Sequence, residues 1–267
     1  MNAAVKRHFN LLAQYFAQYA KVRLAYKADF IIAFFSSMAA TVLGFGFVLV
    51  LFTKIPRLQD WSFNEIIFLY GFSLIPLGFF NVISWNLYDF SELYIVEGKF
   101  DRVLLRPVST LFQVIFEKFR LESLQEVVTG IAVVSVATER LHLTFRIPDF
   151  FWFVLMTVCG SAIYLSVFVI LTAVSFWFED RVGIVPPVFN MLNFGRYPLT
   201  IYNVFIQFLL SWIIPFGFAT FYPTTHFLGR SAFTLYFHLV PVVAVGFLVL
   251  AIVTWNRGVA NYSSTGS

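Results

Sequence analysis

The sequence predicts an all-α polytopic membrane protein with six transmembrane helices. Of its 267 residues, 60% are hydrophobic and only 12% are Asp, Glu, Lys or Arg, about half the share that soluble proteins carry. The mean hydropathy is +0.81. Several charge-free runs reach the length of about 20 residues that a helix needs to cross the apolar core of a bilayer. A soluble fold of this size needs more polar surface, so lipid is the expected solvent.

Charge, cysteine content and the first residues narrow the class further. The net charge of +4 does not indicate nucleic-acid binding. Cys159 is the only cysteine, so an intrachain disulfide is excluded. The first long apolar run begins only near Phe30 and no small-residue cleavage pattern follows, so we expect no cleaved signal peptide. No linker or repeat divides the chain, which indicates one transmembrane domain over residues 1–267.

Residues 1–28 predict an amphipathic helix that lies in the membrane interface. Apolar residues recur at steps of four and three, and polar residues share the opposite face. The apolar positions are Val5, Phe9, Leu12, Phe16 and Tyr19, and the polar ones are Lys6, Asn10, Gln14 and Gln18. Basic residues follow, as expected beside anionic lipid. A helix packed on the rest of the protein is the alternative.

Five further helices are predicted from long apolar runs. Those at 30–53, 66–88, 150–178 and 231–255 contain no Asp, Glu, Lys or Arg. The third crossing is less uniform, because charged residues precede its apolar part at 127–137. We therefore expect one long helix over 112–137 whose first turns project from the membrane.

The fifth crossing has two alternatives. Hydropathy alone selects a helix over 202–221. The other possibility is a helix over 182–198, followed by a broken apolar hairpin over 201–229. Pro215, Gly217, Pro223 and Gly229 would interrupt that hairpin. Broken backbone is tolerated at membrane depth where protein or water covers it. Both alternatives give six crossings.

The positions of the basic residues predict that both termini face the cytoplasm. With the N-terminus inside and the fifth helix at 202–221, the inner segments hold 13 of the 18 Lys and Arg residues and the outer segments hold 5. If Arg196 moves outside, the ratio becomes 12 to 6. Either ratio satisfies the positive-inside rule.

A polar segment over 91–111 separates the second and third crossings. Its charged residues from Val96 to Phe112 are Glu97, Lys99, Asp101, Arg102 and Arg106. Phe100, Val103 and Leu104 recur at helical spacing, and Pro107 disfavours helix at the residue before it. This pattern predicts a short amphipathic helix in a cytoplasmic loop. Mixed charge orients a protein partner better than it binds lipid, so we expect a protein contact. A solvated loop is the alternative.

The sequence lacks the patterns of an enzyme. Its four histidines have no metal-ligand spacing, so no metal site is predicted. A phosphate loop is also absent, because the one Gly-Lys pair, Gly98-Lys99, is followed by Phe100. ATP would therefore be bound by another chain. His238 lies inside the last span, where a packed, hydrogen-bonded residue is favoured over a functional one.

Glu122 and Glu126 have two interpretations. They are four residues apart and share a helix face. They are either a proton or cation relay, or a helix end that faces Lys118, Arg120 or the basic loop. We favour the helix end, because the acids lie on the basic, inner side of the apolar run.

Four stretches resemble ABC-2 type permeases, in the branch of six-helix bacterial export permeases. They are GKFDRVLLRPVS, RYPLTIY, IPFGFATFYPTTHFLG and the ending WNRGVANYSSTGS, which is similar to the family's closing W-x-x-G-x-x-x-Y-x-S-x-G. The match covers nearly the whole chain. The resemblance implies a transport subunit of the bacterial plasma membrane that is not itself an enzyme. It implies no cofactor in this chain, because ATP and Mg would be bound by a partner ABC ATP-binding subunit.

The resemblance also implies where partners bind. The N-terminal helix and the loop at 91–111 would contact the ATP-binding subunit, and the loop helix would be the coupling helix. The residues carried over from the motif are Glu97, Gly98, Phe100, Asp101, Arg102 and Arg106. Such permeases usually carry a re-entrant extracellular hairpin before the sixth helix, which favours 201–229. A second permease chain, identical or related, would complete the transporter.

Candidate path residues follow from the predicted helices. Helix two offers Tyr70, Phe72, Phe79, Asn81, Trp85 and Asn86, and helix five offers Asn190 and Asn193. Polar groups at depth need partners or water, so the asparagines are favoured; for each aromatic residue, contact with lipid or another helix is the favoured alternative. Few charges line this path, so we expect an apolar or amphipathic cargo that is exported.

Other classes fit less well. An ion-coupled secondary transporter or channel, acting without an ATPase, needs paired ionisable groups at mid-membrane depth. Four of the six predicted spans carry no Asp, Glu, Lys or Arg, which argues against it. A non-transporting membrane scaffold is a weaker alternative.

Overall fold

The protein is an all-helical membrane protein. The computed structural model describes residues 3–178 and 185–263, and these contain helices and no β-strand. Five helical stretches are long and apolar enough to cross a membrane: Lys27–Lys54 (α2), Phe63–Ile83 (α3), Leu121–Arg140 (η2 and α7), Ile147–Phe178 (α8 and α9) and Ser231–Asn261 (η6 and α14). A sixth crossing exists if the bent pair Val204–Ile213 and Phe216–Phe227 is one span. The predicted fold class is confirmed at this level.

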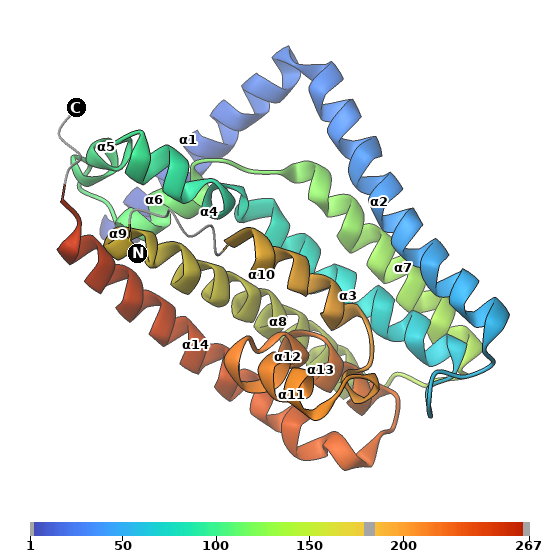
Figure 1. Ribbon diagram of the computed structural model, residues 1–267. Coiled ribbons are helices and arrows are strands. Elements are labelled where there is room, and N and C mark those ends of the chain that lie inside the picture. The colour runs from blue at the N-terminus through green and yellow to red at the C-terminus, as the bar shows by residue number, and fades with distance from the viewer. Residues whose placement is uncertain (1–2, 179–184, 264–267) are drawn as a thin grey trace.

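Helix α3 forms the centre of the bundle (Figure 1). It lies between α7 (Leu124–Arg140) and α8 (Ile147–Ala173), and α14 (Thr234–Asn261) packs along the other side of α8. Fourteen of the 21 residues of α3 are buried. By contrast, only 11% of the apolar window of α2 is buried, because α2 contacts mainly α7 and η2 at the edge of the bundle. The tight core is therefore the α7–α3–α8–α14 row.

The N-terminal segment is helical as expected. Helix α1 (Ala3–Ala25) ends at a break at Tyr26, and α2 leaves it at a sharp angle (Figure 1). The Phe16 ring packs edge-on against Phe119 with centroids 5.9 Å apart, and the Tyr19 hydroxyl accepts the backbone N–H of Leu121 at 3.1 Å. The described part of α1 thus docks on the chain before α7, while its place in a membrane interface stays a prediction.

The chain between α3 and α7 consists of short helices. They are α4 (Trp85–Tyr88), the π-helix η1 (Ser91–Val96), α5 (Phe100–Leu104), α6 (Thr110–Phe116) and the 3-10 turn η2 (Leu121–Ser123). The expected single helix over 112–137 is therefore wrong. Arg120 has non-helical backbone angles, φ −132° and ψ 74°. Its backbone N–H donates a hydrogen bond to the Val82 carbonyl oxygen at 2.9 Å. This bond to the end of α3 replaces the helical bond and separates α6 from α7.

The region before the last span is also broken. It contains α10 (Val185–Met191), η3 (Leu192–Arg196), η4 (Leu199–Ile201), α11 (Val204–Phe208), the π-helix η5 (Leu209–Ile213), α12 (Phe216–Ala219) and α13 (Phe221–Phe227). A straight helix over 202–221 is not formed, because the chain bends by 71° at Ile214 and Pro215. The alternative helix at 182–198 is helical from Val185 to Arg196, and its residues 182–184 lie outside the described residues.

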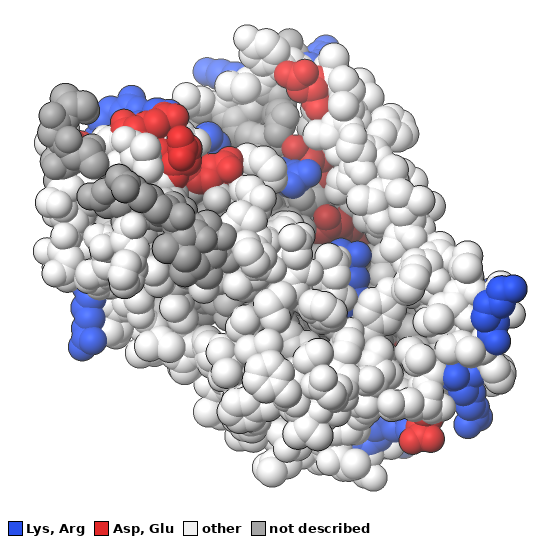
Figure 2. Space-filling view, in the orientation of Figure 1, with Lys and Arg blue, Asp and Glu red and all other residues white. Residues whose placement is uncertain are grey.

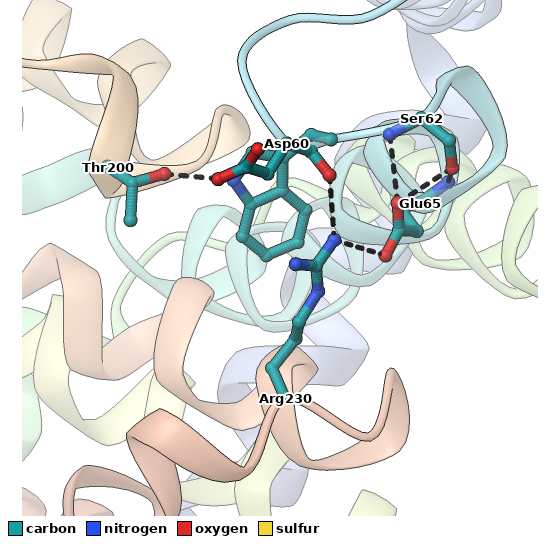
Figure 3. Close-up of polar contacts among 6 residues, drawn as sticks. Asp60, Ser62, Glu65, Thr200 and Arg230 are labelled. Carbon is teal, nitrogen blue, oxygen red and sulfur yellow. Dashed lines mark hydrogen bonds and ion pairs between the residues drawn. The ribbon is translucent and has the colours of Figure 1, made fainter.

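Both ends of the broken segment meet the loop between α2 and α3 (Figure 3). Thr200 directly precedes the segment 201–229, and its Oγ1 accepts a hydrogen bond from Trp61 Nε1 at 2.8 Å. After it ends, Arg230 Nη2 donates to Asp60 O at 2.9 Å and to Glu65 Oε1 at 2.7 Å. The Arg230 guanidinium also lies over the Trp61 ring, 4.5 Å from its centroid. We call this contact the loop clamp.

Glu65 serves the loop clamp and the start of α3 together. Its Oε2 accepts the backbone N–H of Ser62 at 2.8 Å, and the Ser62 hydroxyl accepts the Glu65 N–H in return. This reciprocal arrangement satisfies two otherwise unpaired donors at the helix N-terminus. The same carboxylate therefore starts α3 and fixes the turn before α14.

Replacing Arg230 by Gln should destabilise the protein. The variant loses the ion pair and the stacking on Trp61, and leaves Glu65 without its cation. The pair is partly exposed, so we expect a loss of about 1–2 kcal/mol, less than for a fully buried pair. Thermal unfolding in detergent measures this loss of stability. Arg57→Gln is the control, because Arg57 is an exposed residue of the α2–α3 loop. Equal melting temperatures for the two variants would contradict the loop clamp.

Candidate functional site

An aromatic cluster holds α5 against the ends of two long spans, α8–α9 and α14. We call it the α5 seat; its rings are Phe90, Phe100, Phe176, Trp255 and Tyr262. Phe100 lies at its centre, with ring centroids 5.0 Å from both Phe176 and Tyr262. Phe100 and Trp255 are fully buried. Phe176 comes from α9 (Ser175–Phe178), and Trp255 comes from α14. A displacement of α5 therefore pushes on the ends of both spans.

Hydrogen bonds complete the α5 seat. The Tyr262 hydroxyl donates to Asp101 Oδ1 at 3.0 Å. Burial and the neighbouring Asp101 raise the pKa of Tyr262 to about 12, so this hydroxyl keeps its proton at neutral pH. Trp255 Nε1 donates to Thr110 Oγ1 at 2.9 Å, and Gln113 Nε2 donates to the carbonyls of Val103 and Val108 at 3.1 and 3.0 Å. The loop is thus fixed as one body with α6 and α14.

The residues predicted to contact an ATPase fall into two groups. Phe100 is buried, and Asp101 is partly buried and bonded to Tyr262. Glu97, Arg102 and Arg106 are exposed. Gly98 has φ +67°, a conformation that disfavours other residues, and turns the chain into α5. The structure does not test the ATPase contact itself, which stays a prediction.

Sequence reasoning did not identify the ring partners of Phe100. Phe176 carried no signal of its own, since it ends a uniformly apolar run. The closing W-x-x-G-x-x-x-Y pattern did carry one, because Trp255, Gly258 and Tyr262 all lie at the α5 seat. A Cβ on Gly258 would come within 2.4 Å of the Phe176 ring, so only glycine lets that ring approach α14.

A second candidate site is a polar pocket between α2, α3, α7 and the α10–η3 segment. We call it the membrane pocket; its volume is about 310 Å³. It is lined by Ser36, Ser37, Ala40, Leu77, Asn81, Arg120, Glu126, Phe189, Asn190, Leu192, Asn193 and Arg196. Figure 2 shows acidic and basic side chains in a hollow beside α2. Charged side chains are costly inside a membrane and mark functional sites.

The charges of the membrane pocket have different partners. Asn81 Nδ2 donates to Glu126 Oε2 at 2.8 Å, and Glu126 is only 9% exposed. The Arg120 guanidinium lies over the Trp85 ring at 4.6 Å, and Arg120 Nε is 3.8 Å from Glu122 Oε1. Glu122 thus faces Arg120, as the helix-end interpretation expects. Glu126 does not pair with a helix-end cation but points into the membrane pocket.

Arg196 lies inside the bundle, in neither of the loops that the charge count considered. Its guanidinium is 5.7 Å from the Tyr70 ring centroid, and a Cβ on Gly44 would be 3.3 Å from its Nη1. Gly44 and Tyr70 both belong to spanning helices, α2 and α3. Omitting Arg196 leaves 12 inner and 5 outer basic residues, so the predicted orientation is unchanged.

The eight predicted path residues do not lie together. Asn81, Asn190 and Asn193 line the membrane pocket, and Tyr70 and Trp85 lie against its two arginines. Phe79 is exposed on the bundle surface. Phe72 packs on Phe153 at 5.2 Å, and Asn86 Nδ2 donates to Val114 O at 2.8 Å, both in the protein interior. A role in transport stays a prediction for all eight.

A side chain at position 258 should disrupt the α5 seat. Gly258→Val forces the Phe176 ring to move, and we expect a loss of about 1–3 kcal/mol from overpacking. Gly246→Val on the same helix is the matched control, because a Cβ there meets nothing within 4 Å. The intrinsic effect of valine on a helix is common to both. Unfolding in detergent measures the difference, and equal stability of the two variants would contradict the packing described.

Comparison with known proteins identifies the family of the chain. The profile of a family described as ABC-2 family transporter protein matches residues 36–266, which include the α5 seat and the membrane pocket. No curated protein and no solved structure matches the chain. Because the family match covers most of the sequence, the chain belongs to the ABC-2 family of transporter proteins and is a membrane permease subunit of an ABC transporter.

Proposed function

We propose that this permease exports an apolar or amphipathic cargo across the bacterial plasma membrane, driven by ATP that a separate ABC ATP-binding subunit hydrolyses with Mg. The observation that carries the proposal is the α5 seat. A short helix with exposed charges on one side and a buried phenylalanine on the other has the form of a mechanical contact between subunits.

The coupling works from the exposed side of α5 inward. With the N-terminus inside, α5 faces the cytoplasm and presents Arg102, Leu105 and Arg106, of which Leu105 is 84% exposed. Movement of the ATP-binding subunits displaces α5, and the Phe100 ring transmits this displacement to α9 and α14. The membrane helices then switch the transport pathway from an inward-open state to an outward-open or closed state. ATP drives it only because it binds the two states with different affinity.

The segment 201–229 acts as a re-entrant hairpin on the outer side. The loop clamp supports this assignment, because Thr200 and Arg230 both contact the α2–α3 loop, and a segment that crossed the membrane would end on opposite sides. The α10–η3 segment is then the fifth crossing. The broken backbone of the hairpin is covered by protein, because α12 packs on both α8 and α14, as non-helical backbone at membrane depth requires.

A second permease chain, identical or related, completes the transporter. The poorly buried α2 supports this, since a helix at the edge of one bundle is free to pack on another. Membrane lipid covers the remaining apolar surface.

One observation supports the rival function, an ion-coupled transporter that acts without an ATPase. Glu126 is a buried carboxylate beside a polar pocket, as a proton or cation relay requires. Neutralisation by Glu126→Gln keeps the shape and the bond to Asn81. We expect this variant to keep most of its ATP-dependent transport in proteoliposomes. Complete loss of transport, with transport by the wild type persisting without ATP, would favour the relay.

Two variants separate docking from transmission. Arg102→Ala/Leu105→Ala removes exposed groups of α5 and of the residue that caps it, so we expect much weaker co-purification with the partner ATP-binding subunit. Tyr262→Phe removes only the bond to Asp101, so the complex should form but couple ATPase activity to transport several-fold less well. Arg57→Ala, in the α2–α3 loop, is the control. Unchanged co-purification of the double variant would contradict α5 as the docking element.

A further inference from the structure

We propose that the membrane pocket binds an oxyanion on the head group of the cargo, a phosphate, sulfonate or carboxylate, and that Arg196 is the residue that receives it. This inference rests on the proposed transport function and adds the chemical class of the cargo.

Arg196 is the charged residue of the membrane pocket that has no described carboxylate at ion-pair distance; its side-chain partner is the neutral hydroxyl of Tyr70. Among the described residues, no carboxylate lies within 4.0 Å of its guanidinium, and its buried Nε has no hydrogen-bond partner. The other two charges are better provided for. Arg120 has Glu122 and the Trp85 ring, and Glu126 accepts from Asn81.

The partly buried guanidinium of Arg196 loses part of its hydration, and no carboxylate of the described residues touches it in return. Glu126, in the same pocket, attracts it only from beyond 4.0 Å, so the positive charge is incompletely balanced, which is unfavourable. Arginine keeps its charge at any physiological pH, so the site cannot relieve the cost by deprotonation. The planar guanidinium matches the oxygens of a phosphate or carboxylate, which it binds through paired hydrogen bonds. An oxyanion from the cargo therefore completes the site.

The surroundings of Arg196 suit a head group that enters from the membrane. Asn190 and Asn193 are exposed amides beside it that can donate further hydrogen bonds. Phe189 and Leu192 supply apolar lining for the first carbons of a tail. The volume of about 310 Å³ accepts a head group but not a whole lipid, so the tail leaves along the thinly covered α2 side (Figure 2).

Three probes with the same tail test the proposal on the full chain in neutral detergent. They are dodecyl phosphate, dodecylphosphocholine and dodecyltrimethylammonium, and tryptophan fluorescence measures their binding. We expect the two probes that carry an oxyanion to bind, and Arg196→Gln to weaken both about tenfold or more. Arg196→Lys should retain part of the affinity, and Arg57→Gln should retain all of it. Size-exclusion profiles identify any variant that fails to fold. If Arg196→Gln fails to fold, the reduced affinity of Arg196→Lys is the result that tests the proposal.

Competition separates the possible sources of the oxyanion. Inorganic phosphate should displace dodecyl phosphate only weakly, because it lacks a tail; equal displacement would contradict an amphipathic ligand. Displacement by phosphatidylglycerol at bilayer concentration would assign the site to a structural lipid and overturn the role in cargo binding. Tightest binding of the trimethylammonium probe, abolished by Glu126→Gln, would overturn the charge assignment. These measurements need no ATP-binding subunit. A negative result would therefore contradict the oxyanion site without bearing on the proposed role of α5.

Discussion

The burial of the Phe100 ring among the aromatic side chains of α9 and α14 is the contact on which the rest of that end of the bundle depends. Five rings meet there from four parts of the chain, and edge-to-face packing of such rings is specific in geometry as well as apolar. Gly258 makes room for one ring, and the Tyr262–Asp101 bond fixes the rotation of α5. A five-residue helix has little stability by itself, so its position is set by this packing.

The opposite end of the bundle is held by a different kind of contact. Arg230 joins the turn before α14 to the start of α3 through one carboxylate, one carbonyl and one indole ring. Between the two ends, α3 is enclosed by apolar neighbours, while α2 is almost free of them. The membrane pocket lies on this weakly packed side. The α7–α3–α8–α14 row is therefore tightly packed, and the α2 side beside the membrane pocket is not.

Much of the fold was predictable from the sequence, because a bilayer demands long apolar helices that composition reveals directly. The α2, α3, α8 and α14 spans follow from charge-free runs, and α5 follows from the spacing of Phe100, Val103 and Leu104. Hydropathy failed where tertiary contacts decide the backbone. The bond from Arg120 to Val82 ends a helix that periodicity continues, and the bend at Pro215 breaks a run that is apolar enough to span. Arg196 was read as a loop residue, because a single arginine between apolar residues does not reveal its depth.

The most direct test of the account is cysteine cross-linking to the ATP-binding subunit in membranes. The buried Cys159 is replaced by Ser, and single cysteines are placed at Leu105, directly after α5, and at Gln59 in the α2–α3 loop. A short thiol reagent with a photoactivatable second end, which needs no cysteine on the partner, then joins neighbouring chains on illumination. The account predicts a product with the ATP-binding subunit from position 105 and none from position 59. A product from position 59 alone, or from neither position in an assembled complex, would contradict the role of α5.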